Sequence, residues 1–219
     1  TGREVAGELL DVYRLRSEVV PLLKASRRQQ KYREVYPTET QKWQRVATIV
    51  AELVERGQAV LIGTNSVASS EAISEVLGDG NIEHKVLNAR QDKEEAEIVA
   101  QAGQPGAVMV ATSMAGRGTD IKLADATREA GGLHVIITEL QDASRIDRQL
   151  QGRCARQGDP GFISEILSLE DRLVQKTAGK IMKKTLQSGI RMPQSIGMAI
   201  QRRCQKQIES THKRQRLQS

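Results

Sequence analysis

Short apolar segments alternate with amphipathic helical segments through the middle of the chain. The segment at 38–56 starts with Thr38 as a helix N-cap and places Trp43, Val46 and Val50 on one helical face. Alternation of this kind implies right-handed crossovers and a parallel sheet covered on both faces. The sequence therefore predicts a doubly wound α/β domain. Its five expected strands are "AVLIGT" (59–64), "IEHKVLN" (82–88), "GAVMVAT" (106–112), "GLHVIIT" (132–138) and "FISEILSL" (162–169).

The two ends of the chain have a different pattern. Residues 1–35 are expected to hold an edge helix and strand, then a polar connector at 24–35, leading from an upstream motor domain. The α/β domain is expected to span 36–170. In 171–219, apolar residues recur every four positions from Ile196 to Ile208, which predicts a basic helical extension.

Charge is distributed unevenly along the chain. Residues 172–219 contain twelve Lys or Arg and one acid, a balance of +11, and the whole chain carries +6, so residues 1–171 carry +6 − 11 = −5. A basic segment of this kind binds nucleic acid, an anionic membrane surface or an acidic partner, and a solvated helix face is an equally good interpretation. No apolar run reaches the roughly 20 residues of a membrane span, so a soluble protein is expected.

Two polar stretches follow predicted strands. In "MAGRGTDI", Gly116 and Gly118 allow close approach of the backbone to a ligand, while Arg117 can meet a phosphate and Asp120 a ribose hydroxyl. Because ligands of parallel α/β sheets bind beyond the carboxyl ends of the strands, we expect this stretch to lie there.

The second stretch, "QLQGRCARQGD", is expected at the same edge of the sheet. Arg153 and Arg156 are three residues apart, so on a helix they share a face and point two guanidinium groups at one anion. This is the arrangement of arginine fingers, which stabilise a phosphoryl group in transfer. The alternative for either stretch alone is surface salt bridges and capping glycines.

The cysteines and histidines of the sequence give no further candidates for catalysis or metal binding. Cys154 and Cys204 have no metal-ligand spacing and are expected to be small buried residues, and no metal site is predicted. His134 lies in an apolar segment and is expected to be a core histidine rather than a catalytic base. A phosphate-binding loop with its lysine and a metal-holding carboxylate are not found in this sequence, so the chain is expected to supply half of an ATP site and to be inactive alone.

The chain contains a set of motifs: "MAGRGTDI", "EAGGLHVI", "RIDRQLQGRCARQGDPG", "LSLEDRL" and "YPTETQKWQRVATIV". Together they resemble the second nucleotide-binding domain of SecA, the motor of bacterial preprotein translocation. The resemblance covers nearly the whole chain, with departures such as Gln151 for an arginine and Ala155 for a glycine, which favour a specialised paralogue.

The resemblance implies a RecA-like domain that clamps ATP and Mg²⁺ against a first nucleotide-binding domain, which holds most contacts to both. It implies that Asp120 and Arg117 contact the nucleotide, with Gln149 and Gly116 and Gly118 beside it, and that Arg153 and Arg156 reach the γ-phosphate. It also implies that 171–219 begins a helical scaffold.

The partners implied are a SecY-type membrane channel, an unfolded preprotein and an anionic membrane surface, with a cytoplasmic location peripheral to the inner membrane. The competing interpretations are a superfamily 2 nucleic-acid helicase, whose binding weakens steeply with salt, and a non-catalytic interaction module.

Overall fold

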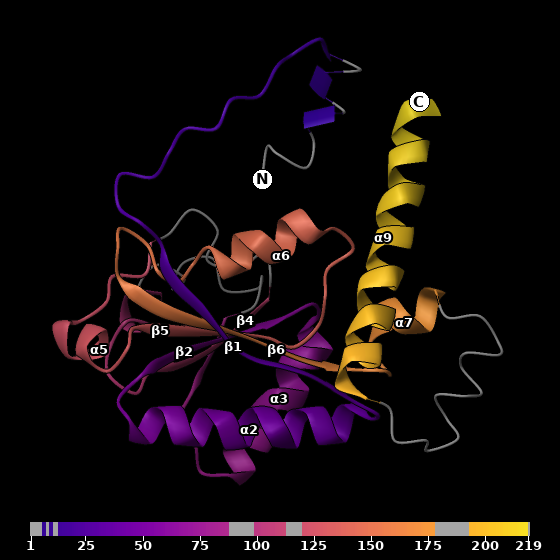
Figure 1. The fold of residues 1–219 in the computed structure, drawn as a ribbon. Helices are drawn as coiled ribbons and strands as arrows, with labels where there is room; N and C mark the ends of the chain where they lie inside the picture. The colour runs from indigo at the N-terminus through magenta and orange to yellow at the C-terminus, as the bar shows by residue number, and fades with distance from the viewer. Residues whose placement is uncertain are drawn as a thin grey trace.

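The computed structural model of the chain describes residues 6, 7, 9, 10, 13–87, 99–112, 120–177 and 193–218. Its centre is a six-stranded sheet in which every adjacent pair of strands is parallel, in the order β1-β6-β5-β2-β4-β3 (Figure 1). The predicted doubly wound parallel α/β fold is confirmed. The strands are β1 (Arg27–Tyr36), β2 (Ala59–Thr64), β3 (Lys85–Leu87), β4 (Val108–Thr112), β5 (Leu133–Ile137) and β6 (Pro160–Ser168).

Strand β1 corrects the prediction of a polar connector at 24–35. It forms one edge of the sheet and pairs with β6 from Arg27↔Pro160 to Tyr36↔Ser168. Its first five residues are exposed, and only Val35 is buried. Polar and charged side chains are typical of edge strands, which have one unpaired side to protect from association. The strand therefore lacks the apolar signal on which the prediction depended.

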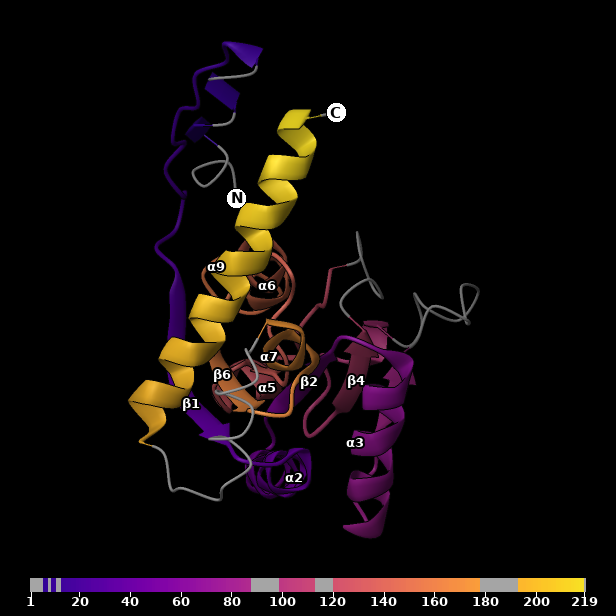
Figure 2. The same ribbon diagram turned by 90° about the vertical axis from the view of Figure 1, so that its right-hand side faces the viewer.

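Helices cover the two faces of the sheet, as Figures 1 and 2 show. Helices α2 and α3 pack on one face, and α6, α7 and α9 lie on the other. Alternation along β2 divides the core accordingly, since Val60 and Ile62 face α2 and α3 while Leu61 faces the opposite layer. The helices are α2 (Glu39–Glu55), α3 (Val67–Asp79), α5 (Asp125–Glu129), α6 (Ser144–Gln151), α7 (Arg172–Thr177) and α9 (Gln194–Gln218).

The predicted start and buried face of α2 are confirmed. Thr38 is the N-cap, and its hydroxyl accepts a hydrogen bond from the N–H of Gln41 at 3.3 Å. Trp43, Val46 and Val50 are buried, as expected from their spacing. Asp92, which the sequence predicts as the N-cap of a further helix, lies outside the described residues.

The chain termini extend away from the sheet. Residues 14–26 form no helix or strand, so the strand expected within 1–23 is absent from the described part of that segment. Several apolar side chains there are exposed, with Leu23 fully so. Helix α9 runs along the β1 edge and extends beyond the sheet (Figures 1 and 2). Its predicted apolar repeat faces the core at Cys204, Ile200 and Ile208, while Ile196 is 49% exposed.

Candidate functional site

Asp120 and Arg156 form an ion pair across 36 residues of sequence. Nη1 of Arg156 donates to Oδ1 of Asp120 at 2.5 Å, and the two side chains are 39% and 45% exposed respectively. An ion pair this open to water contributes little to stability, about 0–1 kcal/mol. A ligand with stronger charges can therefore displace it.

The backbone around Arg156 corrects the helical expectation for the two arginines. Helix α6 ends at Gln151 with Gly152 as its C-cap, so Arg153 and Arg156 lie in the following loop and share no helix face. Ala155, which lies between them, has a φ of 54° in the left-handed region of the backbone. The loop at 152–158, called here the arginine loop, is held by a hydrogen bond from Nε of Arg156 to the Gly152 carbonyl at 2.9 Å.

The arginine loop lies at the amino ends of β1 and β6, not at the carboxyl ends as expected. Helix α6 starts beyond the carboxyl end of β5 and returns the chain to the start of β6, which carries the loop to the opposite edge. Gly161, the second residue of β6, lies beneath the loop: a Cβ there would come within 2.8 Å of the Ala155 nitrogen. Only glycine leaves this room.

Asp120 reaches the same edge by a different route. It follows β4 by eight residues, and four residues later the N–H of Ala124 donates to the carbonyl of Gly103 at 3.0 Å. Gly103 precedes β4, so the segment after Asp120 has already returned to the amino ends of the strands.

A hollow of about 900 Å³ adjoins the ion pair. Its charged lining consists of Lys24, before β1, Arg28, the second residue of β1, and Asp120 and Arg156 from the two loops described above. Three cations and one carboxylate give this lining a formal charge of +2. Such a hollow favours an anion with several charged oxygens, such as a phosphate chain.

The remaining predicted site residues are placed as follows. Among the described residues that line the hollow, Arg156 is present and Arg153 is not. Arg153 is half-buried, and its N–H donates to the Leu150 carbonyl at 3.0 Å. Gln149 is exposed on α6. Gly116, Arg117 and Gly118 lie outside the described residues.

Two predictions about single residues are confirmed. His134 is a core residue: Nε2 lies 2.7 Å from the Ser164 hydroxyl, the ring stacks on Phe162, and burial lowers its pKa to about 4. Cys154 and Cys204 are free and buried. Burial raises the pKa of the Cys154 thiol to about 11.

The carboxyl ends of the strands hold a buried polar network that the sequence did not suggest. Lys42 of α2 donates to Asp171 at 2.6 Å, and both side chains are essentially inaccessible to solvent. Burial raises the pKa of Asp171 to about 7, against the opposing effect of Lys42. Nearby, burial raises the pKa of Asp147 to about 6.

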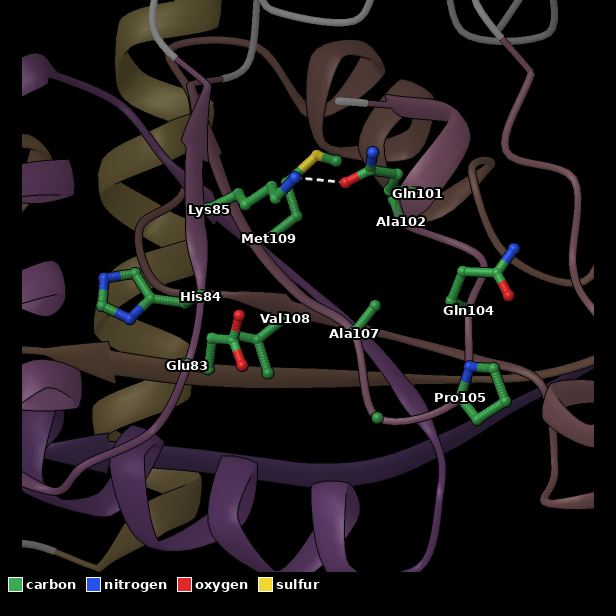
Figure 3. Close-up of a pocket in the computed structure, with 11 residues that line it drawn as sticks. Glu83, His84, Lys85, Gln101, Ala102, Gln104, Pro105, Ala107, Val108 and Met109 are labelled. Carbon is green, nitrogen blue, oxygen red and sulfur yellow. Dashed lines mark hydrogen bonds between the residues drawn. The ribbon is translucent and has the colours of Figure 1, made fainter. Parts of the chain in front are cut away.

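A second, smaller hollow of about 330 Å³ lies beside β3 and β4, on the side of the sheet away from β1. It adjoins the amino ends of these two strands. Figure 3 shows its lining, in which Lys85 donates to Gln101. Glu83 and His84 are also part of it. None of the described site residues predicted from the sequence lines this hollow.

Two features are absent from the described residues. No group of three or more His, Cys, Asp or Glu is arranged there to hold a metal ion. No helix in the same part of the chain is both long and apolar enough to cross a membrane.

The six parallel strands in this order, with helices on both faces, define a RecA-like doubly wound domain. A chain in the crystal structure of the E. coli DEAD-box protein SrmB bound to regulator of ribonuclease activity A aligns with a TM-score of 0.52 and 18% identity, covering 75% of this chain and 99% of that one. The similarity concerns the fold alone. The model of the SecA P-loop domain family matches residues 25–128 and 124–194. The chain belongs to the SecA family.

Curated relatives agree with this assignment. Protein translocase subunit SecA 2 of Bordetella avium is 49% identical over 83% of this chain, and protein translocase subunit SecA 3 of Magnetococcus marinus is 44% identical over the full chain. The chain spans 27% and 34% of the length of these two relatives.

Proposed function

We propose that this chain is the second motor domain, with the first scaffold helices, of an ATPase that drives preprotein translocation. The observation that carries the proposal is the Asp120–Arg156 ion pair at an open, cationic hollow, in a chain of the SecA family. In a complete protein this hollow faces the nucleotide held by an upstream domain.

The proposed chemistry is charge stabilisation by arginine. Bound ATP displaces the exposed contact between Asp120 and Arg156, so that Asp120 accepts from the ribose and Arg156 donates to the γ-phosphate. Charge on the phosphoryl oxygens grows during transfer, and a guanidinium held against them stabilises the transition state. Arg153 is proposed as the second finger. Gly116, Arg117, Gly118 and Gln149 are proposed to contact the nucleotide beside Asp120.

The rest of the ATP site belongs to the proposed upstream domain. That domain supplies the phosphate-binding loop and the carboxylates for Mg²⁺, which explains why this chain is expected to be inactive alone. Hydrolysis releases the arginines, and the resulting movement of the two domains acts on an unfolded preprotein in a SecY-type channel. The proposed location is cytoplasmic and peripheral to the inner membrane.

The basic segment 171–219 is proposed to start the helical scaffold. Helix α9 contacts the motor domain through Gln201, whose Nε2 donates to the Ser168 carbonyl at 2.6 Å, and through Arg202, which pairs with Glu165 at 2.5 Å. These contacts support a role for the positive charge within the protein. An anionic membrane surface is a further proposed partner, and nucleic acid is less favoured.

The test compares this chain with a polypeptide that includes the upstream domain. The proposal expects no ATP hydrolysis by residues 1–219, hydrolysis by the longer protein, and stimulation by channel-containing membranes with an unfolded preprotein. RNA is the control additive. Stimulation of hydrolysis by RNA, with salt-sensitive RNA binding and no response to preprotein, would favour the helicase alternative instead. A longer protein that contains a phosphate-binding loop but hydrolyses no ATP would contradict the proposal.

A further inference from the structure

Arg28 connects the start of β1 to the end of α6. Its Nη1 donates to the carbonyl oxygen of Gln151 at 3.2 Å, across 123 residues of sequence. Gln151 is the last residue of α6, so this carbonyl is one of those left without a partner inside the helix. A cation at this position also interacts favourably with the negative end of the helix dipole.

Two further side chains donate to the same end of α6. The thiol of Cys154 donates to the Gln151 carbonyl at 3.4 Å, and Nε of Arg156 donates to the next carbonyl, that of Gly152, at 2.9 Å. Arg28, Cys154 and Arg156 therefore converge on two successive carbonyls. The guanidinium of Arg156 is held relative to the same helix end that Arg28 contacts.

The pairing of β1 with β6 places Arg28 for this contact. Arg28 lies opposite Gly161, the residue on which the arginine loop rests. Arg27, one position earlier, points to the other face of the sheet because side chains alternate along a strand. Arg28 is thus an exposed residue at the start of β1, and it contacts the last residue of α6, directly before the loop that carries Arg156.

We propose that Arg28 is a positioning residue for the arginine loop: by holding the end of α6 it fixes the place of the Arg156 guanidinium, and it ties that place to the start of β1. The role in catalysis rests on the proposed function, whereas the effect on the loop does not. The two are therefore tested separately, with Arg27→Gln as the matched control, since it removes the same charge from the neighbouring residue.

The first test measures the loop directly, in the 219-residue chain. The reaction rate of Cys154 with iodoacetamide is followed by peptide mass spectrometry, which separates it from Cys204. Arg28→Gln is expected to speed labelling about tenfold, because one hydrogen bond from a charged donor no longer holds the loop closed. The lost charge by itself would slow labelling, because the Arg28 cation lowers the pKa of the Cys154 thiol and so favours the reactive thiolate. A rate for Arg28→Gln equal to that of Arg27→Gln overturns the proposal.

The second test measures ATP turnover in a polypeptide that contains the upstream domain. Arg28→Gln is expected to lower kcat about tenfold and, because Arg28 also lines the hollow, to raise KM for ATP by a smaller factor. Arg28→Lys, which keeps one charged donor, recovers most of the loss in kcat. Arg27→Gln keeps normal turnover. Normal kcat in Arg28→Gln overturns the catalytic part of the inference if Arg156→Ala is impaired. If Arg156→Ala also turns over normally, it is the proposed function that fails, and the labelling result still decides the positioning of the loop.

Discussion

Gln205 of α9 donates through Nε2 to Oδ2 of Asp147 in α6 at 2.5 Å, and each residue is 2% exposed. The same amide donates to the Gln141 carbonyl at 2.9 Å. One turn further along α9, Glu209 accepts from the N–H of Ser144, the first residue of α6, at 2.5 Å. The long basic helix is therefore joined to the start of the helix whose other end carries the arginine loop.

This contact predicts that Gln205→Leu destabilises the fold. The substitution leaves one oxygen of the buried Asp147 carboxyl without its donor, and a lost partner for a buried polar group costs about 2 kcal/mol. Chemical denaturation measures the free energy of unfolding. Gln207→Leu on the exposed side of α9 is the control and changes little. Equal stability of the two variants would show that the Gln205 contact contributes nothing.

Loss of the Lys42–Asp171 ion pair is expected to lower the free energy of unfolding more than Gln205→Leu does. Lys42→Met leaves a buried carboxyl without its cation and is expected to lower the free energy of unfolding by about 3–5 kcal/mol. Adding Asp171→Asn removes the stranded charge, so the double variant recovers a large part of this loss. Urea titrations of the wild type, the two single variants Lys42→Met and Asp171→Asn, and the double variant form the cycle. Purely additive losses would contradict a direct interaction between the two side chains.

His134 predicts a pH-dependent difference between two proteins. Its pKa is lowered from 6.5 to about 4 by burial and, to a lesser extent, by Lys31. The unfolded chain therefore binds a proton near pH 6.5 while the folded chain does not, and stability present above pH 6.5 is lost as the pH falls to 4. Compared with His134→Gln, the wild type is expected to lose about 3 kcal/mol over this range.

The comparison with a variant is needed because Asp147 and Asp171 act in the opposite direction. Their folded pKa values are raised, so their stabilising contribution is lost as the pH rises through about 6 and 7. Both carboxyls are present in both proteins, so the difference isolates His134. Parallel stability curves for the two proteins between pH 7 and 4 would refute the assignment of a buried, neutral imidazole.

Replacing Ala155 in the arginine loop by glycine is expected to stabilise the fold. Its φ of 54° is unfavourable for a residue with a Cβ, and glycine adopts it freely. Ala155→Gly is expected to raise the free energy of unfolding by about 0.5–1 kcal/mol, after the extra entropy of glycine in the unfolded chain is subtracted. Ala130→Gly, at a φ of −70°, is the control and is expected to destabilise. A loss of stability in Ala155→Gly comparable with the control would contradict the assigned backbone strain.

The apolar core was readable from the sequence, whereas the edge was not. Strand β2 is buried along its whole length and coincides with the predicted "AVLIGT". The charged residues of strand β1 indicate a connector when the sequence is considered alone. An edge strand needs little burial and carries charges on its exposed side chains, so its sequence lacks an apolar pattern. The burial of Lys42 was also not predicted, because a lysine in a helix is expected at the surface. Its partner Asp171 lies 129 residues away in the sequence and is placed beside it only by the fold.

Of the described residues predicted for the site, the structure brings Asp120 and Arg156 together, at the other end of the strands from the one expected. The resemblance to SecA associated Asp120 with Arg156, and the structure joins them directly. Their position at the amino ends of the strands depends on the direction in which α6 returns across the sheet, and the periodicity of the sequence carries no such information. Arg28 was missed for the same reason, since its contact with Gln151 depends on the pairing of β1 with β6.

The most direct test of the central claim is the steady-state ATP turnover of Arg156→Ala in a polypeptide that contains the upstream domain, with nucleotide affinity measured in parallel. The account predicts that turnover falls by about 10³ or more while affinity for ATP is nearly unchanged, because the arginine acts on charge that develops in the transition state. Turnover equal to that of the wild type, at matched nucleotide occupancy, would contradict it.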